Sequence, residues 1–501
     1  MSGDPTAPSD TDDADILDAT SAGRLAARGG ALRVAGYLSG SLASLGAAAL
    51  LYRHLGLTGV GRYGLVLALI GIIGGFSDLG LTVVGVRSAS TLEPRERTAM
   101  LRDLLGLRLA LTIAGIVVIA LLCLPIYPVI VAEGVAVGGL GLVFQVWLDN
   151  YVVSLIVSLR MGWVAAIQFG NNFAVAVLTV LLVLAKGHLL GFIAITIPVS
   201  FVSLGVAIRL LRGERGFTPS FNAARWRAML AQSVVYSGAV AAATLYFYAA
   251  IVLASLLANH HQLGYFQLSF RVTTVLTLVP ALLSGSALPI FSRAARDDAQ
   301  RLGYALNRVL EVALLLGAWV ALTLGVGARF AVELVGGSSG QHNFLPAAPV
   351  LVFQAVALAG TFVSSVAQYG LLSLGLSRRI LVINIGGLVG ALVLMCVLIP
   401  LDGARGAAIG TMVGELSAAL AAWVALCTAR PDLRPSLRIV PGVALALLAG
   451  CTPLLLTSLP VVARAALAAV IYPAVIIATR SFPHEVSHLL PPRLRTLLHG
   501  R

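Results

Sequence analysis

The sequence predicts an all-α, polytopic membrane protein of about fourteen transmembrane helices, and two observations carry this prediction. The 501 residues are 58% hydrophobic but only 11% charged, whereas an ordinary soluble domain is about 25% charged. The mean hydropathy is +0.95. Between residues 31 and 479, fourteen apolar stretches follow one another, each close to the roughly 20 residues that a membrane-spanning helix needs.

The distribution of basic residues sets the expected orientation. Cytoplasmic loops of membrane proteins collect Lys and Arg. If the N-terminus is cytoplasmic, 25 of the 34 Lys and Arg residues lie on the cytoplasmic side, six lie in external loops and three lie inside spans. We therefore expect a cell-membrane (plasma or inner) protein with both termini in the cytoplasm. The net charge of +13 then reflects topology, and no nucleic-acid partner is expected.

The loops between the spans are too short to hold an enzyme domain outside the membrane. The sequence also contains no phosphate-binding loop, no H-E-x-x-H and no G-x-S-x-G motif. The four cysteines lie in apolar runs without C-x-x-C spacing, which predicts neither a disulfide nor a metal site. We therefore expect a protein that is not an enzyme and has no bound cofactor.

Two segments six spans apart resemble each other: NNFAVAVLTVLLVLAKGHLLGFIAITIP at 171–198 and NIGGLVGALVLMCVLIPLDGARGAAIGTMV at 384–413. Six is an even number, so the two halves share one orientation, as in parallel transporter repeats. This predicts two six-helix lobes around a central cavity, followed by two extra C-terminal helices.

The expected boundaries follow from this repeat. Residues 1–23 contain six Asp and no Lys or Arg, which is typical of a disordered segment. We expect a disordered cytoplasmic leader at 1–29, an N-lobe of spans 1–6 at 30–211, a basic cytoplasmic linker at 212–228, a C-lobe of spans 7–12 at 229–430, spans 13–14 at 431–480 and a cytoplasmic tail at 481–501.

Charged side chains inside the spans are candidate functional residues, because a charge in hydrocarbon is costly. Asp78 lies in the cytoplasmic half of span 2, and we expect it to face the inter-lobe cavity or its cytoplasmic gate. The alternative is a helix-end carboxylate without a role in transport. Asp149 and Asn150 lie in the middle of span 4, where Asp149 is either a proton or cation site or the counter-ion of Arg271. Gln145 shares a helix face with Asp149.

Further polar residues share faces of predicted helices, at i, i+3, i+4 in span 5 and within about 60° of arc in span 10. Such stripes either hydrate a cavity or join helices by hydrogen bonds. In contrast, Glu415 and the Arg308–Glu311 pair are expected to be structural. The stripes consist of Gln168, Asn171 and Asn172 in span 5, and of Gln354, Thr361, Ser365 and Gln368 in span 10.

Four segments in order resemble a known group of proteins: LGLTGVGRYGLVLALI…SDLGL, LGYFQLSFRVTTVLTLVPALLSGSALPIFSRAA, VELVGGSSGQHNFLPAAPVLVFQ and GLSRRILVINIGGLVGALVLMCVLIPLDGARGAAIGTMVGE. The chain resembles, over roughly residues 25–480, the Wzx-type polysaccharide (O-unit) flippases of the multidrug/oligosaccharidyl-lipid/polysaccharide exporter (MOP) superfamily. This resemblance implies two six-helix lobes in a V-shape, alternating access, and transfer of a pyrophosphate-linked saccharide from the cytoplasmic to the external leaflet.

The resemblance makes Arg271 the first candidate for the substrate site, because the family carries an arginine at the matching position in span 8. A guanidinium can bind a phosphate through two parallel hydrogen bonds. The alternatives are a structural pair with Asp149 or a side chain that extends to the interface. Arg53 and Arg62 flank the first external turn, where they either bind pyrophosphate at the exit or are ordinary interfacial arginines.

The first hypothesis is therefore a flippase for a polyprenyl-pyrophosphate-linked oligosaccharide used in cell-surface polysaccharide assembly. Its partners would be the lipid-linked glycan, membrane lipid and polysaccharide polymerase machinery, and a proton or Na⁺ is the candidate coupling ion. The alternatives are a lipid II flippase, a multidrug or cation antiporter of the same superfamily, and a scaffold for a glycan synthase. An antiporter would favour an anionic cavity, whereas Arg271 and Arg308 here offset the four in-span carboxylates.

Overall fold

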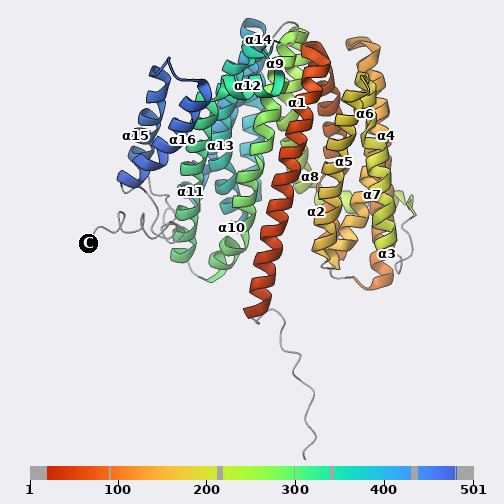
Figure 1. The fold of residues 1–501 in the computed structure, drawn as a ribbon. Coiled ribbons are helices and arrows are strands. Elements are labelled where there is room, and N and C mark those ends of the chain that lie inside the picture. The colour runs from red at the N-terminus through yellow and green to blue at the C-terminus, as the bar shows by residue number, and fades with distance from the viewer. Residues whose placement is uncertain are drawn as a thin grey trace, which may run out of the picture.

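The structure is a computed structural model of the chain, and it describes residues 20–89, 92–158, 160–211, 218–297, 299–338, 343–429, 438–479 and 481. Within these ranges all regular structure is helical, as the composition predicts. Figure 1 shows two bundles side by side, with a short helix pair at one edge of the second bundle.

The first bundle is the N-lobe, and its long helices stand roughly parallel (Figure 1). Apolar runs with few helix breakers form most of each helix, and Pro94 begins one of them at a position where a proline lacks no needed N–H. The helices are α1 (Thr20–Asp78), α2 (Leu81–Ala89), α3 (Pro94–Ile126), α4 (Val129–Val157), α5 (Met161–Leu184), α6 (Leu189–Ala194) and α7 (Thr196–Leu210).

The second bundle is the C-lobe, and the pair α15–α16 packs against its helix α11 through a small apolar cluster that includes Leu322 and Tyr472. The C-lobe helices are α8 (Ala223–Leu257), α9 (His260–Leu276), α10 (Leu278–Asp297), α11 (Ala299–Val326), α12 (Ala328–Gly336), α13 (Ala348–Ser373) and α14 (Ser377–Ala429), and the added pair is α15 (Val440–Cys451) and α16 (Val461–Ala478).

The expectation of fourteen spans is confirmed. Eleven described helical segments are long and apolar enough to cross a membrane, and the shorter apolar helix Val440–Leu455 adds a twelfth. Two of the eleven each contain two helices joined at a glycine in a non-helical conformation, at Gly56 (φ 67°) and Gly403 (φ 55°). Residues on both sides of Gly56, such as Tyr52 and Tyr63, line one cavity, so the chain folds back there.

The two lobes repeat their irregularities. The turn between α5 and α6 uses Lys186 with φ 55°, and the corresponding turn in α14 uses Gly403, also with φ 55°. Span 2 is interrupted between Asp78 and Leu81, and span 8 is interrupted at Thr277, three residues before Pro280, which cannot donate a helical hydrogen bond. These matching interruptions support the parallel repeat expected from the sequence.

Some expected boundaries differ from the structure. Helix α1 begins at Thr20, so residues 20–29 are helical although the leader was expected to be disordered up to residue 29; Ala and Arg are favourable helix residues there. Helix α8 begins at Ala223, inside the expected linker at 212–228, where Asn222 accepts hydrogen bonds from two backbone N–H groups as an N-cap. Residues 1–19, 212–217 and 482–501 lie outside the described part of the chain.

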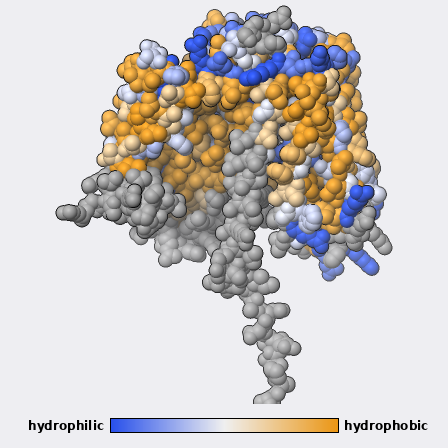
Figure 2. Space-filling model, in the orientation of Figure 1, coloured by the Kyte–Doolittle hydropathy of each residue, from blue (hydrophilic) through white to orange (hydrophobic). Residues whose placement is uncertain are grey.

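The surface is that of a multi-pass membrane protein. Figure 2 shows hydrophobic side chains covering the flanks, with hydrophilic residues gathered at the upper end, where α9, α12 and α14 meet. Large apolar side chains are exposed on these flanks, including Leu121 (61%), Leu184 (75%) and Val470 (66%). Such exposure is unfavourable in water and favourable in lipid.

The lobes meet along span 2, the second half of α1, where small residues allow close approach. A Cβ on Gly71 would lie 2.3 Å from the Tyr248 ring, and one on Gly75 would lie 2.3 Å from Thr244. Both partners are on α8 of the C-lobe. Further along, Ser237 donates a hydrogen bond to the carbonyl oxygen of Leu79. The two lobes are therefore in direct contact along α8.

The beginning of α8 is attached to the N-lobe. The buried carboxylate of Asp103 in α3 accepts a 2.7 Å bond from Arg225, and the Asp103 carbonyl accepts one from the Trp226 indole. Just before α8, the Ser220 N–H bonds to the Arg102 carbonyl at 3.0 Å. Gly106 is required at this contact, because a Cβ there would lie 2.0 Å from the Ser220 carbonyl oxygen.

Substituting Arg225→Ala is expected to lower the free energy of unfolding, because the buried Asp103 carboxylate loses its charged donor. Thermal unfolding of the detergent-solubilised protein measures this change. Arg227→Ala, at an exposed position two residues away, is the control. Equal stability of the two variants would contradict the assigned attachment.

Candidate functional site

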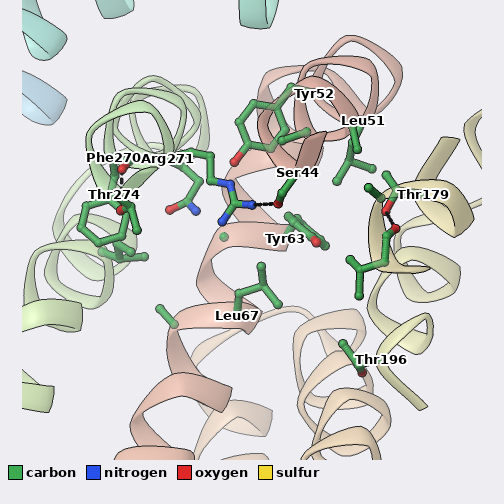
Figure 3. Close-up of a pocket in the computed structure, with 18 of the residues that line it drawn as sticks. Ser44, Leu51, Tyr52, Tyr63, Leu67, Thr179, Thr196, Phe270, Arg271 and Thr274 are labelled. Carbon is green, nitrogen blue, oxygen red and sulfur yellow. Dashed lines mark hydrogen bonds between the residues drawn. The ribbon is translucent and has the colours of Figure 1, made fainter. Parts of the chain in front are cut away.

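A polar site lies between the two lobes. A cavity of about 340 Å³, hereafter the inter-lobe cavity, receives side chains from α1, α5, α7, α8 and α9 (Figure 3). Its wall mixes aromatic rings with hydroxyl and amide groups and one guanidinium. The polar and aromatic lining residues are Ser44, Tyr52, Tyr63, Asn172, Thr179, Thr196, Phe247, Tyr248, Gln267, Phe270, Arg271 and Thr274.

Arg271 provides the charge of this cavity. Its guanidinium extends from α9 toward α1, and its Nη2 donates a 2.5 Å hydrogen bond to the Ser44 hydroxyl (Figure 3). Among the described residues, no ion pair includes Arg271. The hydroxyl groups of Tyr52 and Tyr63 belong to the same wall. A cation lined by neutral polar groups is suited to an anionic ligand.

Asp78 does not stand alone in the membrane. It ends the second half of α1 and accepts hydrogen bonds from the backbone N–H groups of Gly80 (3.2 Å) and Thr82 (3.3 Å) and from the Thr82 hydroxyl. It therefore caps α2, whose start needs acceptors. The Arg108 guanidinium of α3 lies 3.3 Å from its carboxylate and compensates its charge.

Asp149 shares the same arginine. Arg108 Nη2 lies 3.5 Å from the Asp149 carboxylate, so Asp149 pairs with Arg108 and not with Arg271. Gln145 donates a 2.9 Å bond to Asp149, and its own carbonyl oxygen accepts from Asn171 at 3.5 Å. We call Asp78, Arg108, Asp149, Gln145 and Asn171 the N-lobe network; it joins spans 2, 3, 4 and 5.

The N-lobe network contains two carboxylates and one guanidinium, and Arg108 is 97% buried whereas Asp78 and Asp149 are partly exposed, with 29% and 37% of their side chains accessible. The two carboxylates are therefore partly accessible, whereas the guanidinium between them is not. Within the described residues, no group of three or more His, Cys, Asp or Glu is placed to hold a metal ion.

Substituting Arg108→Ala is expected to destabilise the protein by up to about 3 kcal/mol, because it leaves two in-membrane carboxylates without their cationic partner. Adding Asp149→Asn should restore part of that loss by removing one of the two negative charges. Thermal unfolding in detergent measures both variants. Additive destabilisation by the two substitutions would show that the pair does not interact.

A second cavity lies inside the C-lobe. It has a volume of about 100 Å³ and is lined by α8, α9, α13 and α14. Glu415 lines it and accepts a 2.9 Å bond from Thr361, and Gln354 accepts a bond from Thr273 at 3.3 Å. Glu415, expected to be structural, thus borders a mostly apolar cavity that contains a few polar groups. The expected Arg308–Glu311 pair is confirmed at 2.8 Å.

The remaining candidate residues lie apart from Arg271. The exposed Arg53 donates hydrogen bonds to the carbonyl oxygens of Glu333 (3.2 Å) and Leu334 (2.6 Å) near the end of α12, so it caps that helix. Arg62 is half-buried and does not line the inter-lobe cavity. The roles of these two arginines in pyrophosphate binding stay predictions.

The amide side chains of the expected polar stripes lie in different environments. Asn172 lines the inter-lobe cavity, whereas Asn171 belongs to the N-lobe network and Gln168 is exposed. Asn150 is buried and donates a 3.2 Å bond to the Leu101 carbonyl, which joins α4 to α3. Gln368 is half-buried and lines neither described cavity, in contrast to Gln354.

Several lining residues were missed by sequence reasoning. Gln267 and Thr274 stand at i−4 and i+3 from Arg271 and share its helix face, so this spacing would have identified them. Tyr52 and Tyr63 flank the Gly56 turn, but their inward direction depends on how the hairpin packs. Ser44 had no distinguishing local pattern. Arg108, which belongs to the N-lobe network, could have been found as one of the three basic residues inside spans.

Comparisons with known proteins identify the fold. The chain superposes on the lipid II flippase MurJ in an inward closed conformation with a TM-score of 0.73 and 12% identity, over 89% of this chain and 98% of that one. It also superposes on a multidrug resistance MATE family transporter of the MOP superfamily in an inward-facing conformation, with a TM-score of 0.66 and 16% identity over 81% and 99% of the two chains.

A third similar structure is a MOP superfamily transporter from Pyrococcus furiosus whose binding pocket is described as having reverse polarity, suggesting a different function. It superposes with a TM-score of 0.54 and 15% identity, over 80% of this chain and 96% of that one. No protein-family model matches the sequence, and no curated protein matches it. The chain therefore has the MOP transporter-like fold, which is a multi-pass membrane architecture.

Proposed function

We propose that this protein is a flippase that moves a polyprenyl-pyrophosphate-linked oligosaccharide from the cytoplasmic to the external leaflet, for assembly of a cell-surface polysaccharide. The observation that carries the proposal is the position of Arg271: a guanidinium without a carboxylate partner among the described residues, inside a polar cavity between two helical lobes. The protein would act as a transporter and not as an enzyme.

The chemistry of the substrate matches this cavity. A polyprenyl tail is compatible with lipid, but the saccharide and its anionic pyrophosphate need water, hydrogen bonds and a cation. Arg271 supplies planar donors for a phosphate, and Gln267, Asn172 and Thr274 beside it supply hydrogen-bonding groups for a sugar. Tyr52 and Tyr63 supply ring faces, which suit the apolar faces of pyranose rings.

The two lobes suit alternating access. In this mechanism the lobes rock around a central site that opens to one side at a time. The direct contacts along Gly71 and Gly75 provide a surface on which the lobes can part and rejoin. We further propose that both termini are cytoplasmic, which follows from the distribution of arginines, and that the polysaccharide polymerase machinery receives the product.

A coupling ion would act at the carboxylates. The candidates are the Asp78–Asp149 pair in the N-lobe network and Glu415 in the C-lobe cavity. A proton or Na⁺ is the expected ion, because either can compensate a single carboxylate in a confined site.

A lipid II flippase is the second candidate function. The similarity to MurJ extends over 89% of this chain and favours this alternative on the basis of the fold. In a deletion strain, lipid-linked polysaccharide units accumulating on the cytoplasmic face would support the first function. Accumulating lipid II would support the second.

Substituting Arg271→Ala is expected to reduce export of the lipid-linked glycan at least tenfold. Charge-assisted hydrogen bonds contribute roughly 1.5–3 kcal/mol, and about 1.4 kcal/mol corresponds to a factor of ten. Surface polysaccharide, normalised to the amount of protein in the membrane, measures the effect. Arg464→Ala is the control, because Arg464 donates to the Leu459 carbonyl beside α16, far along the chain from the cavity. Unchanged surface polysaccharide in the Arg271 variant would rule out the proposed role.

A further inference from the structure

Arg271 and Ser44 line two adjoining chambers. One is the inter-lobe cavity, and the other is a second chamber of about 340 Å³. The second chamber continues along α9 and α10 through Val275, Leu278 and Ala281. Four residues line both chambers: Ser44, Asn172, Arg271 and Thr274.

The hydrogen bond between Arg271 and Ser44 crosses from one lobe to the other where the two chambers adjoin. It joins α9 of the C-lobe to α1 of the N-lobe at 2.5 Å (Figure 3). A side chain that bridges two lobes must release its partner before the lobes separate there. Passage between the chambers would therefore depend on which acceptor the Arg271 guanidinium binds.

The acceptor in this bond is replaceable. Ser44 offers a neutral hydroxyl, whereas a phosphate oxygen is charged and forms roughly twice as strong a hydrogen bond with a guanidinium. Ser44 thus occupies a position on Arg271 that an anion would take. The neutral Ser44 hydroxyl can release the Arg271 guanidinium. An aspartate at position 44 would instead hold the guanidinium in an ion pair.

We propose that the Ser44–Arg271 hydrogen bond is the closed position of a partition between the two chambers, and that a diphosphate opens it by replacing Ser44 as the acceptor. This inference rests on the proposed function for its ligand, but the partition itself depends only on residues of this chain. Ser44 then acts as a positioning residue that holds Arg271 across the passage.

The partition is tested by cysteine accessibility in sealed vesicles. The four native cysteines are replaced by alanine, and Thr196→Cys reports on the inter-lobe cavity while Ala281→Cys reports on the second chamber. A membrane-impermeant methanethiosulfonate reagent is added to the side from which Ala281→Cys reacts. In the parent, Thr196→Cys should react slowly from that side.

Adding Ser44→Ala should increase the Thr196→Cys labelling rate from that side about tenfold, the factor expected for losing one hydrogen bond to a charged group. The rate at Ala281→Cys should not change. Ser44→Asp should slow the Thr196→Cys reaction below the parent rate. The matched control is Thr179→Val, because the Thr179 hydroxyl lines the same cavity but donates to its own helix at the Val175 carbonyl. An unchanged Thr196→Cys rate in Ser44→Ala would overturn the partition.

The exchange of acceptors is tested with inorganic pyrophosphate as the probe. Its affinity for the detergent-solubilised protein, measured by calorimetric titration, should rise about tenfold in Ser44→Ala, because no hydroxyl competes for Arg271. It should fall in Ser44→Asp. Equal affinities in all three proteins, or no binding to any of them, would overturn the exchange.

These outcomes separate the inference from the proposed function. If Arg271→Ala abolishes export while Ser44→Ala leaves the Thr196→Cys rate unchanged, the flippase function stands and the partition is wrong. If Ser44→Ala increases the rate while the deletion strain accumulates neither lipid-linked polysaccharide units nor lipid II, the partition stands and the flippase function is wrong.

Discussion

The interaction on which the account depends is the contact of Arg271 with Ser44 across the boundary between two helical lobes. A guanidinium cannot lose its charge in a protein, and a charge at membrane depth needs polar surroundings. The inter-lobe cavity provides them with hydroxyl, amide and phenol groups. The fold therefore surrounds one permanent positive charge with polar residues from both lobes.

The two in-membrane arginines of the central region have opposite surroundings. Arg108 is almost fully buried and lies between Asp78 and Asp149, so its charge is compensated within the N-lobe. Arg271 has a neutral acceptor and borders two chambers. This difference, and not the presence of an arginine as such, separates a group that joins helices from a group available to an anion.

The sequence predicted the helical class, the fourteen spans and the parallel repeat, because these depend on local hydropathy and on span number. It also singled out Arg271, Asp78 and Asp149. It did not predict that Arg108 pairs with both carboxylates, since that depends on how spans 2, 3 and 4 pack. Ser44 was missed for the same reason: one serine among many becomes a partner of Arg271 only when the lobes meet.

The most direct test of the central claim compares lipid-linked saccharides that differ only in having one or two phosphates. Native mass spectrometry of the purified protein measures their relative binding. If the cavity around Arg271 recognises the pyrophosphate, the diphosphate lipid should bind more tightly than the monophosphate, and Arg271→Ala should remove the difference. Equal binding of the two lipids to the unsubstituted protein would contradict the account.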